Sequence, residues 1–256
     1  MQMRTSNFLL LVVLLTSTGC AALRGTDDGP LADSLSQIMP HGDRDHFVYI
    51  WQKVAGGKRV AEGVQVEHIQ RSPESDEFEI VLSENGVPAG RLRMRDDGQE
   101  IALIDEDDLD QHMRLTFAPP LTQYEIPLVP GERTSRSTAT ITSLIKENEA
   151  TSVDVSQVVR LTSARNVKSS VGDHPHGIGV ETERTLHWPW GDAAFRMSAM
   201  LVPGLGEVRS EARTGDDFVM RRELACAIIA GRAVGDCKTV DARVKELRNA
   251  GPADVR

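Results

Sequence analysis

Most of the chain is a succession of short segments in which apolar and polar residues alternate, and this pattern constrains the fold more than any other feature. It runs from about residue 46 to residue 223. Alternation with a period of two places successive side chains on opposite faces of a β-strand. The Asn85-Gly86 and Asp97-Gly98 pairs favour tight hairpin turns, because such turns need residues that accept a positive φ. The pattern predicts roughly ten or more strands in an antiparallel meander.

A sheet of this size is expected to bend, because strongly twisted open sheets of many strands curl or split. We therefore predict a mainly β fold, a single strongly curved antiparallel sheet or half-barrel, with a short C-terminal helix that begins near Thr239. Two sets of apolar residues should face its core. They are Phe78, Ile80, Leu82, Leu92, Met94, Ile101 and Leu103 in the first half and Val153, Val155, Val159 and Leu161 in the second.

The middle of the chain is expected to interrupt the strands. The acidic run at residues 105–110 is typical of a solvated loop, and the prolines at positions 119, 120, 127 and 130 argue against helix or central strand. The predicted organisation is a signal peptide at residues 1–19 and a lipidated cysteine with a flexible tether and a short helix at 20–45. The antiparallel β domain follows at 46–223, and a C-terminal helix and tail at 224–256.

The N-terminus has the three parts of a secretory signal. Arg4 supplies a positive charge, an apolar segment ends at Leu15, and small or polar residues lead to Cys20. The apolar segment is far shorter than the roughly 20 residues of a membrane-spanning helix. The sequence Ser17-Thr18-Gly19-Cys20 resembles the lipobox of bacterial lipoproteins. The resemblance implies that Cys20 is lipidated and becomes the mature N-terminus. Because Ala21 follows instead of Asp, it also implies the outer membrane, facing the periplasm. The alternative is an ordinary secretory signal that happens to end at a cysteine.

The charge balance excludes nucleic acid as a partner. Without residues 1–19 the chain has 28 basic and 38 acidic residues, a formal charge of −10. A nucleic-acid-binding protein needs a net basic face, and only short clusters are basic here. The remaining length is enough for one substantial β core.

Two further cysteines, Cys226 and Cys237, form an even pair with a glycine-containing connection. In an exported protein such a pair predicts a disulfide that closes a short loop. The alternative is two free thiols, because the sequence does not place the two Cα atoms within bridging distance.

A second resemblance covers residues 117–213. The segments FAPPL, EIPLVPG and LVPGLGEVRSEAR look like the proline- and glycine-containing pattern of an uncharacterised family of bacterial periplasmic proteins. This resemblance implies a strongly curved β-sheet of the broad type found in periplasmic carriers of lipids and lipoproteins. The chain departs from the pattern at Met200-Leu201-Val202, where the family usually has a Trp-Tyr pair.

Motifs for catalysis, metal binding or a cofactor are not evident. The histidines of the DHPH segment, His174 and His176, lie on opposite sides of a proline and lack a third ligand, so we expect no metal site. In the RLRMR segment, Arg91, Arg93 and Arg95 project from one face of a strand. They form a possible binding stripe for anionic head groups or for an acidic partner. The alternative is a solvated outer face balanced by nearby acidic residues.

These observations predict a lipoprotein of the cell envelope that is not an enzyme and needs no cofactor. The first hypothesis is a periplasm-facing binding module whose curved sheet holds a lipid, an acyl chain or another lipoprotein. The second is a structural or scaffolding lipoprotein that docks an envelope protein complex. Composition separates the two only slightly, because the same apolar residues can line an acyl cavity or close a core.

Overall fold

The computed structural model describes residues 31–40, 42–71, 74–146, 149–214, 218–240, 242 and 245. The signal segment and Cys20 lie outside the described residues. One short helix, α1 (Leu35–Ile38), precedes the strands, in agreement with the predicted short helix before Pro40. The strands are β1 (His46–Ala55), β2 (Lys58–Arg71), β3 (Glu77–Glu84), β4 (Val87–Asp96), β5 (Glu100–Asp108), β6 (Met113–Glu125), β7 (Gly131–Ser143), β8 (Ala150–Ser169), β9 (Gly172–Trp188), β10 (Gly191–Val202), β11 (Gly206–Thr214), β12 (Phe218–Ile229) and β13 (Arg232–Gly235).

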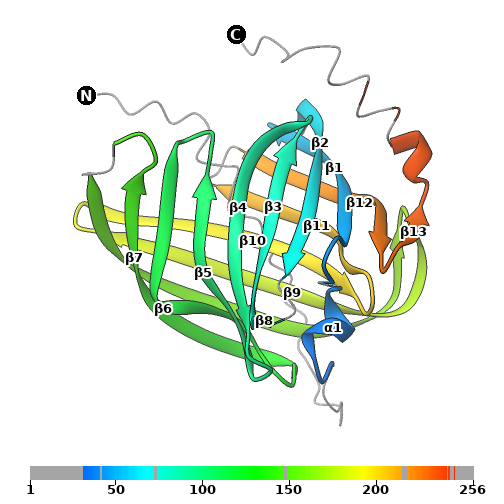
Figure 1. The fold of residues 1–256 in the computed structure, drawn as a ribbon, viewed down its shortest axis with the longest axis horizontal. Coiled ribbons are helices and arrows are strands. Elements are labelled where there is room, and N and C mark those ends of the chain that lie inside the picture. The colour runs from blue at the N-terminus through cyan, green and yellow to red at the C-terminus, as the bar shows by residue number, and fades with distance from the viewer. Residues whose placement is uncertain are drawn as a thin grey trace.

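The strands form one antiparallel meander, as predicted, but the sheet closes on itself. Each strand pairs with the next in sequence, and β1 also pairs with β12, for example Phe47 with Ala227 and Trp51 with Arg222. The result is a closed barrel of 12 strands with β13 as an extra strand, so the prediction of an open half-barrel is wrong. Closure satisfies the backbone donors and acceptors of β1 that an open edge would expose. In Figure 1, β2 to β7 stand upright in front while β8 to β11 run across behind them.

Local turn chemistry follows the sequence closely. In the turn between β3 and β4, Asn85 has a φ of 48° and Gly86 a φ of 82°, which confirms the predicted hairpin. Gly98, in the next connection, between β4 and β5, has a φ of 80°. All residues predicted to face the core in both halves of the sheet are buried.

The proline segment differs from the prediction, because Pro119 and Pro120 lie inside β6. The ladder between β5 and β6 steps from the pair Leu103–Leu121 to the pair Asp105–Thr116. The residues of β6 between these pairs form an irregular bulge, where a missing backbone N–H costs no ladder hydrogen bond. The strand therefore accommodates the prolines at the point where its pairing is interrupted.

The two ends of the described chain cover the barrel. At the N-terminal side, Leu31 donates its backbone N–H to Leu128 O at 2.6 Å, and Ile38 is buried against the core. At the C-terminal side, β12 and β13 extend the sheet past the predicted boundary at residue 223. Helical residues begin at Cys237, two positions before the predicted start, and Val240 packs on the outer face of the barrel. None of the helices in the described part of the chain is long and apolar enough to cross a membrane.

Cys226 and Cys237 form a disulfide in the structure, with their Cα atoms 5.2 Å apart. Cys226 lies in β12 and Cys237 at the start of the helix, so the bridge fastens the C-terminal segment to the barrel. This Cα–Cα distance, which the sequence alone could not provide, is within the usual range for bridged cysteines.

Candidate binding groove

The arginine stripe on β4 is occupied by neighbouring carboxylates. Arg91 contacts Glu79 at 2.7 Å, Asp107 at 3.1 Å and Asp105 at 3.2 Å. Arg93 is 2.5 Å from Asp105. Beyond them, Arg95 is 2.6 Å from a carboxylate of β5, Glu100. The guanidinium groups are thus paired along the sheet, which favours the balanced outer face over an open anion-binding stripe.

The acidic run that supplies these partners is a strand and not the predicted solvated loop. Residues 105–108 belong to β5, and all four side chains are buried. Arg114 of β6 adds a two-pronged contact to Asp107, with hydrogen bonds of 2.6 and 2.9 Å. Hydrogen bonds from Arg91 on one side and Arg114 on the other offset the cost of burying Asp107. The pKa of Asp107 is therefore lowered: burial alone raises it, and Arg114 and Arg91 outweigh that effect.

A charged cluster also lies inside the barrel, where the sequence predicts only apolar contacts. We call Arg222 of β12, Glu67 of β2 and Glu207 of β11 the interior triad. The Arg222 guanidinium donates to Glu67 at 2.5 Å and to both oxygens of Glu207 at 2.6 and 2.8 Å. It also lies 4.4 Å from the ring centre of Tyr49. All members of the triad are buried, so each charge depends on the others for compensation.

The triad holds two carboxylates against one guanidinium. Burial raises the pKa of Glu67. The nearby charge of Glu207 raises it further, and Arg222 only partly opposes this rise. Burial would lower the pKa of Arg222, but Glu207 and Glu67 outweigh it and the pKa is raised. Gln65 donates a further hydrogen bond to Glu67 at 3.0 Å. The guanidinium therefore stays charged and links three strands across the barrel.

A second buried pair joins the opposite region of the interior. Arg184 of β9 contacts Glu106 of β5 at 3.3 Å and donates to the Gln157 side chain at 3.1 Å. Gln157 in turn donates to the backbone oxygen of Thr122 at 3.0 Å. Together with the hydrophobic core, these networks occupy the centre of the barrel with the protein's own side chains.

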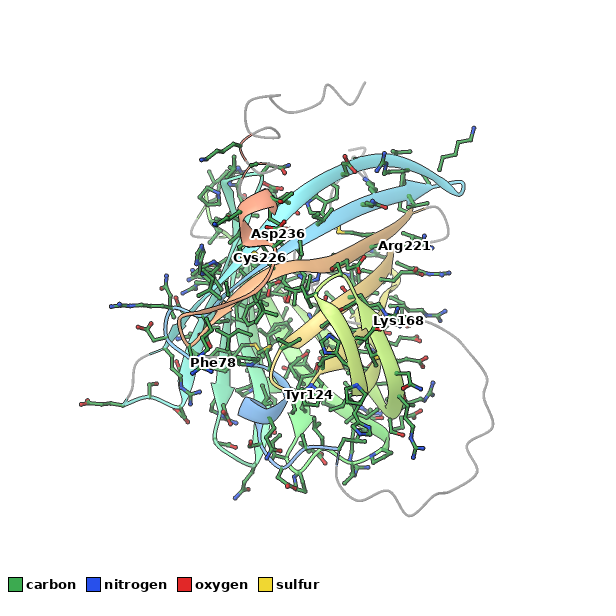
Figure 2. All side chains as sticks on the ribbon, turned by 90° about the vertical axis from the view of Figure 1, so that its right-hand side faces the viewer. Phe78, Tyr124, Lys168, Arg221, Cys226 and Asp236 are labelled. Carbon is green, nitrogen blue, oxygen red and sulfur yellow. A yellow bond between two sulfur atoms is a disulfide. The ribbon has the colours of Figure 1, made fainter. Side chains whose placement is uncertain are left out.

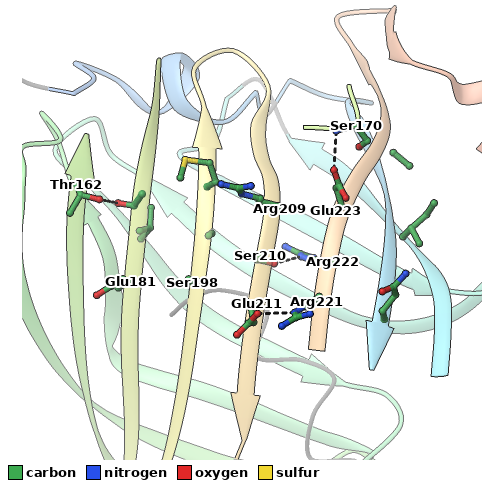
Figure 3. Close-up of a pocket in the computed structure, with 17 residues that line it drawn as sticks. Thr162, Ser170, Glu181, Ser198, Arg209, Ser210, Glu211, Arg221, Arg222 and Glu223 are labelled. Atoms are coloured by element: carbon green, nitrogen blue, oxygen red, sulfur yellow. Dashed lines mark hydrogen bonds and ion pairs between the residues drawn. The ribbon is translucent and has the colours of Figure 1, made fainter. Parts of the chain in front are cut away.

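A hollow lies on the outside of the barrel. It has a volume of about 690 Å³ and crosses the outer faces of β8 to β12 and β1 (Figure 3). We call it the outer groove. Its polar lining residues include Gln52, Thr162, Ser170, Glu181, Ser198, Arg209, Glu211, Arg221 and Glu223. A volume of this size suits a small organic ligand or part of a lipid.

The hairpin between β8 and β9 forms one wall of the outer groove. Its tip reaches β12, where Ser170 donates its backbone N–H to Glu223 at 2.9 Å and its hydroxyl to Leu224 O. In Figure 2 this hairpin is marked by Lys168, and it lies below β12, the strand that carries Arg221. Its curvature requires Gly177, because a Cβ at this position would lie 2.7 Å from Val167 and 3.0 Å from Leu201 O.

Charges in the outer groove balance one another. Arg221 donates to Glu211 at 2.9 Å, and Glu181 accepts from Arg160 at 3.1 Å. Three glutamates line the hollow with Arg209, Arg221 and Arg222, but the Arg222 guanidinium is already paired inside the barrel with the carboxylates of the interior triad. Ile50 and Met200 add apolar surface. A ligand that fits this lining has polar and apolar parts and no large net charge.

The sequence gives little sign of the groove or of the interior clusters. The alternation in β2 separates Val64, Val66 and His68 from Gln65 and Glu67, and a hydrophobic reading would place the valines inside. The structure instead points Gln65 and Glu67 inward and buries Val64 on the outer side, against Cys226 and Val240. The groove residues are spread over six strands far apart in the sequence, so no local motif could have marked the groove.

No family model matches the chain, and no curated protein matches it. Two solved structures resemble it. One is described as an exported protein with a YmcC-like fold from Bacteroides fragilis NCTC 9343, with a TM-score of 0.48, 13% identity and coverage of 77% of this chain and 99% of that chain. The other is described as a lipoprotein from Parabacteroides distasonis ATCC 8503, with a TM-score of 0.45, 12% identity and coverage of 73% and 95%. Likenesses at this level do not indicate what the protein binds, and the family pattern at residues 117–213 stays a prediction.

Proposed function

We propose that this protein is a lipid-anchored, periplasm-facing binding module of the outer membrane, without catalytic activity, whose ligand lies in the outer groove. The observation behind this proposal is the contrast between the interior of the barrel and its outside. The interior holds the core and the interior triad, whereas the outside carries an open groove with a volume of about 690 Å³. The earlier hypothesis of a ligand on the inner face of the sheet is replaced by this one.

The lining of the outer groove favours an amphiphilic ligand. Paired charges such as Glu211 and Arg221 can meet a head group that carries both signs, and Ile50 and Met200 offer apolar contact to a chain. A phospholipid or a lipidated peptide segment of another envelope protein has this combination of groups. The volume is enough for part of such a molecule and not for the whole.

Anchoring is tested by Cys20→Ala. The unsubstituted protein, expressed in a Gram-negative host, should fractionate with outer membranes. The variant should appear in the soluble periplasmic fraction or retain its signal segment, because no other residue can accept the lipid thioether. Recovery of the unsubstituted protein as a free periplasmic species with an unmodified N-terminus would refute the anchor.

Ligand binding is tested by native mass spectrometry on the mature chain with Cys20→Ser, purified without detergent. We expect co-purified lipid on this protein and its loss in Ser198→Trp, because Ser198 lines the outer groove and an indole there would project into the space that the ligand occupies. Ser152→Trp is the matched control, since Ser152 is exposed on β8 and does not line the groove. A lipid that persists in Ser198→Trp would place it elsewhere in the molecule.

The second candidate is a scaffold that docks an envelope complex. The filled interior favours it, because a barrel closed by its own side chains has no need of cargo for stability. If native mass spectrometry shows only the mass of the unliganded protein, and the protein takes up no fluorescent fatty acid, the scaffold replaces the binding module as the proposed function.

A further inference from the structure

Exposed apolar side chains gather at one end of the barrel. In an antiparallel meander all connections from an odd-numbered strand to the next even-numbered strand lie at the same end, here called the apolar end. In Figure 1 the β3–β4 connection lies at the top and the β9–β10 connection at the left. Among the described residues, seven large apolar side chains are exposed, and six of them lie at or beside these connections. The six are Val60, Val87, Leu144, Ile145, Trp190 and Phe218.

Such a distribution is unusual for a solvated surface. Exposed apolar residues are common on soluble proteins, but they are normally scattered singly. Here they come from five different hairpins and share one end, while the seventh, Ile50, lies in the outer groove. Separate hairpins arrive at the same end only through the fold, so the gathering is not a by-product of one apolar segment.

The most exposed of the six is held in a fixed position. Trp190, in the β9–β10 turn, has 75% of its surface exposed, and its ring stacks on Trp188 with 5.1 Å between ring centres. Trp188 in turn packs against the core. On the neighbouring β7–β8 connection, Ile145 is 68% exposed. An apolar side chain that is presented rigidly to solvent loses little conformational entropy when it inserts into another phase.

Lysines accompany the apolar side chains. The chain has six lysines, and three of them, Lys53, Lys58 and Lys146, are on the β1–β2 and β7–β8 hairpins near these connections. The Lys53 ammonium lies 4.6 Å from the ring centre of Phe218. Long basic side chains beside tryptophan and aliphatic residues are typical of the water–membrane interface, where the apolar part is buried and the charge stays among the head groups.

We propose that the apolar end inserts its six exposed side chains into the interfacial layer of a lipid bilayer. In sequence, acidic residues are at least as frequent as lysines on or beside these connections, and they include Asp110, Glu147, Glu149, Asp192, Asp216 and Asp217. Lys146 is itself 3.2 Å from Glu149. Charge attraction to anionic lipids is therefore weak, and apolar burial supplies the affinity. Separate protruding tips suit a deformable bilayer surface better than a rigid protein surface, which requires a contiguous complementary patch.

The anchor of the proposed function is compatible with this orientation. Leu31 is fastened beside Leu128, in the β6–β7 connection at the opposite end. The residues from Cys20 to Leu31 can span at most about 36–40 Å when extended. A barrel strand the length of β6 rises roughly 30–35 Å once its tilt is included. The tether is therefore long enough for the lipid and the apolar end to reach the same bilayer.

Vesicle binding of the whole mature chain with Cys20→Ser tests the inference, because this protein has no anchor. With vesicles of phosphatidylethanolamine and phosphatidylglycerol, we expect co-sedimentation that persists at high salt, and quenching of tryptophan emission by brominated lipid. The double variant Trp190→Ser/Ile145→Ser should lower the partition coefficient at least about tenfold, because each side chain contributes apolar burial.

Val129→Ser is the matched control, since it removes a partly exposed apolar side chain from the β6–β7 connection, at the opposite end of the barrel and outside the outer groove. Ser198→Trp should leave vesicle binding unchanged, so failure of the groove proposal and failure of this one are distinguishable. Both substituted positions of the double variant are well exposed, and circular dichroism checks that it is folded. The inference is overturned if the parent protein stays in the supernatant, or if the double variant sediments as well as the parent.

Discussion

Arg222→Met is expected to lower the free energy of unfolding by about 3–5 kcal/mol, because it leaves Glu67 and Glu207 buried without their cation. Chemical denaturation of the mature domain measures the change. Arg160→Met is the control: this arginine pairs with Glu132 at 2.6 Å and with Glu181 at 3.1 Å, but it is half exposed, so its loss should cost at most about 1 kcal/mol.

The defect should depend on pH in a defined direction. Burial already raises the pKa of Glu67, and removal of Arg222 takes away the group that opposes this rise. A carboxyl with a raised pKa in the folded state favours folding fully below its unfolded pKa, and this contribution is lost as the pH rises through the folded value. The Arg222→Met defect should therefore shrink on acidification.

Neutralising the two carboxylates should also restore stability. The triple variant Arg222→Met/Glu67→Gln/Glu207→Gln should recover a large part of the loss, because two neutral amides replace the buried carboxylates that need a cation. Equal losses for Arg222→Met and Arg160→Met, or a triple variant weaker than the single one, would contradict the account of the interior triad.

Removal of the disulfide has the second largest expected effect. The bridge spans a separation of 11 residues, and the loop-entropy relation gives about 2–3 kcal/mol for a loop of this length. The double variant Cys226→Ala/Cys237→Ala should lose that much in denaturant, with the signal coming from the C-terminal segment as well as from the barrel. Valine at both positions is a second variant that keeps more of the apolar contact around Val48 and Val64.

Thiol counting checks the bridge separately. The mature chain with Cys20→Ser should show no free thiol when it is unfolded without reductant, and two after reduction. Two free thiols before reduction would show that the pair is not oxidised, and the stability difference would then have to come from packing alone.

Short-range features of this fold were predictable because neighbouring residues determine them. The Asn85-Gly86 turn follows from the φ values that these two residues accept, and the alternation in β3 to β5 fixes which side chains face the core. The Cys226–Cys237 pairing needs only a short connection. The pairing of the β4 arginines with the β5 carboxylates is also local. The sequence therefore offered a charge-balanced outer face as one of two interpretations of these arginines.

Longer-range features were decided by the tertiary structure. Closure depends on pairing between β1 and β12, at opposite ends of the domain, and no local pattern encodes which strands meet. Once the barrel closes, its interior supplies Arg222 as a partner for Glu67, so a side chain that local rules place outside becomes stable inside. The bulge in β6 likewise removes the penalty that made Pro119 and Pro120 look incompatible with a strand.

The two candidate binding surfaces were also decided by the tertiary structure. The outer groove draws residues from six strands, and the apolar end draws six side chains from five hairpins. In the sequence neither set forms a contiguous motif, and exposed residues of these types are ordinary on any protein surface. The sequence by itself therefore determined most of the strands and their turns, whereas lipidation at Cys20 stays a prediction. Closure of the barrel decided which distant side chains share a surface, because only pairing across the whole chain brings them together.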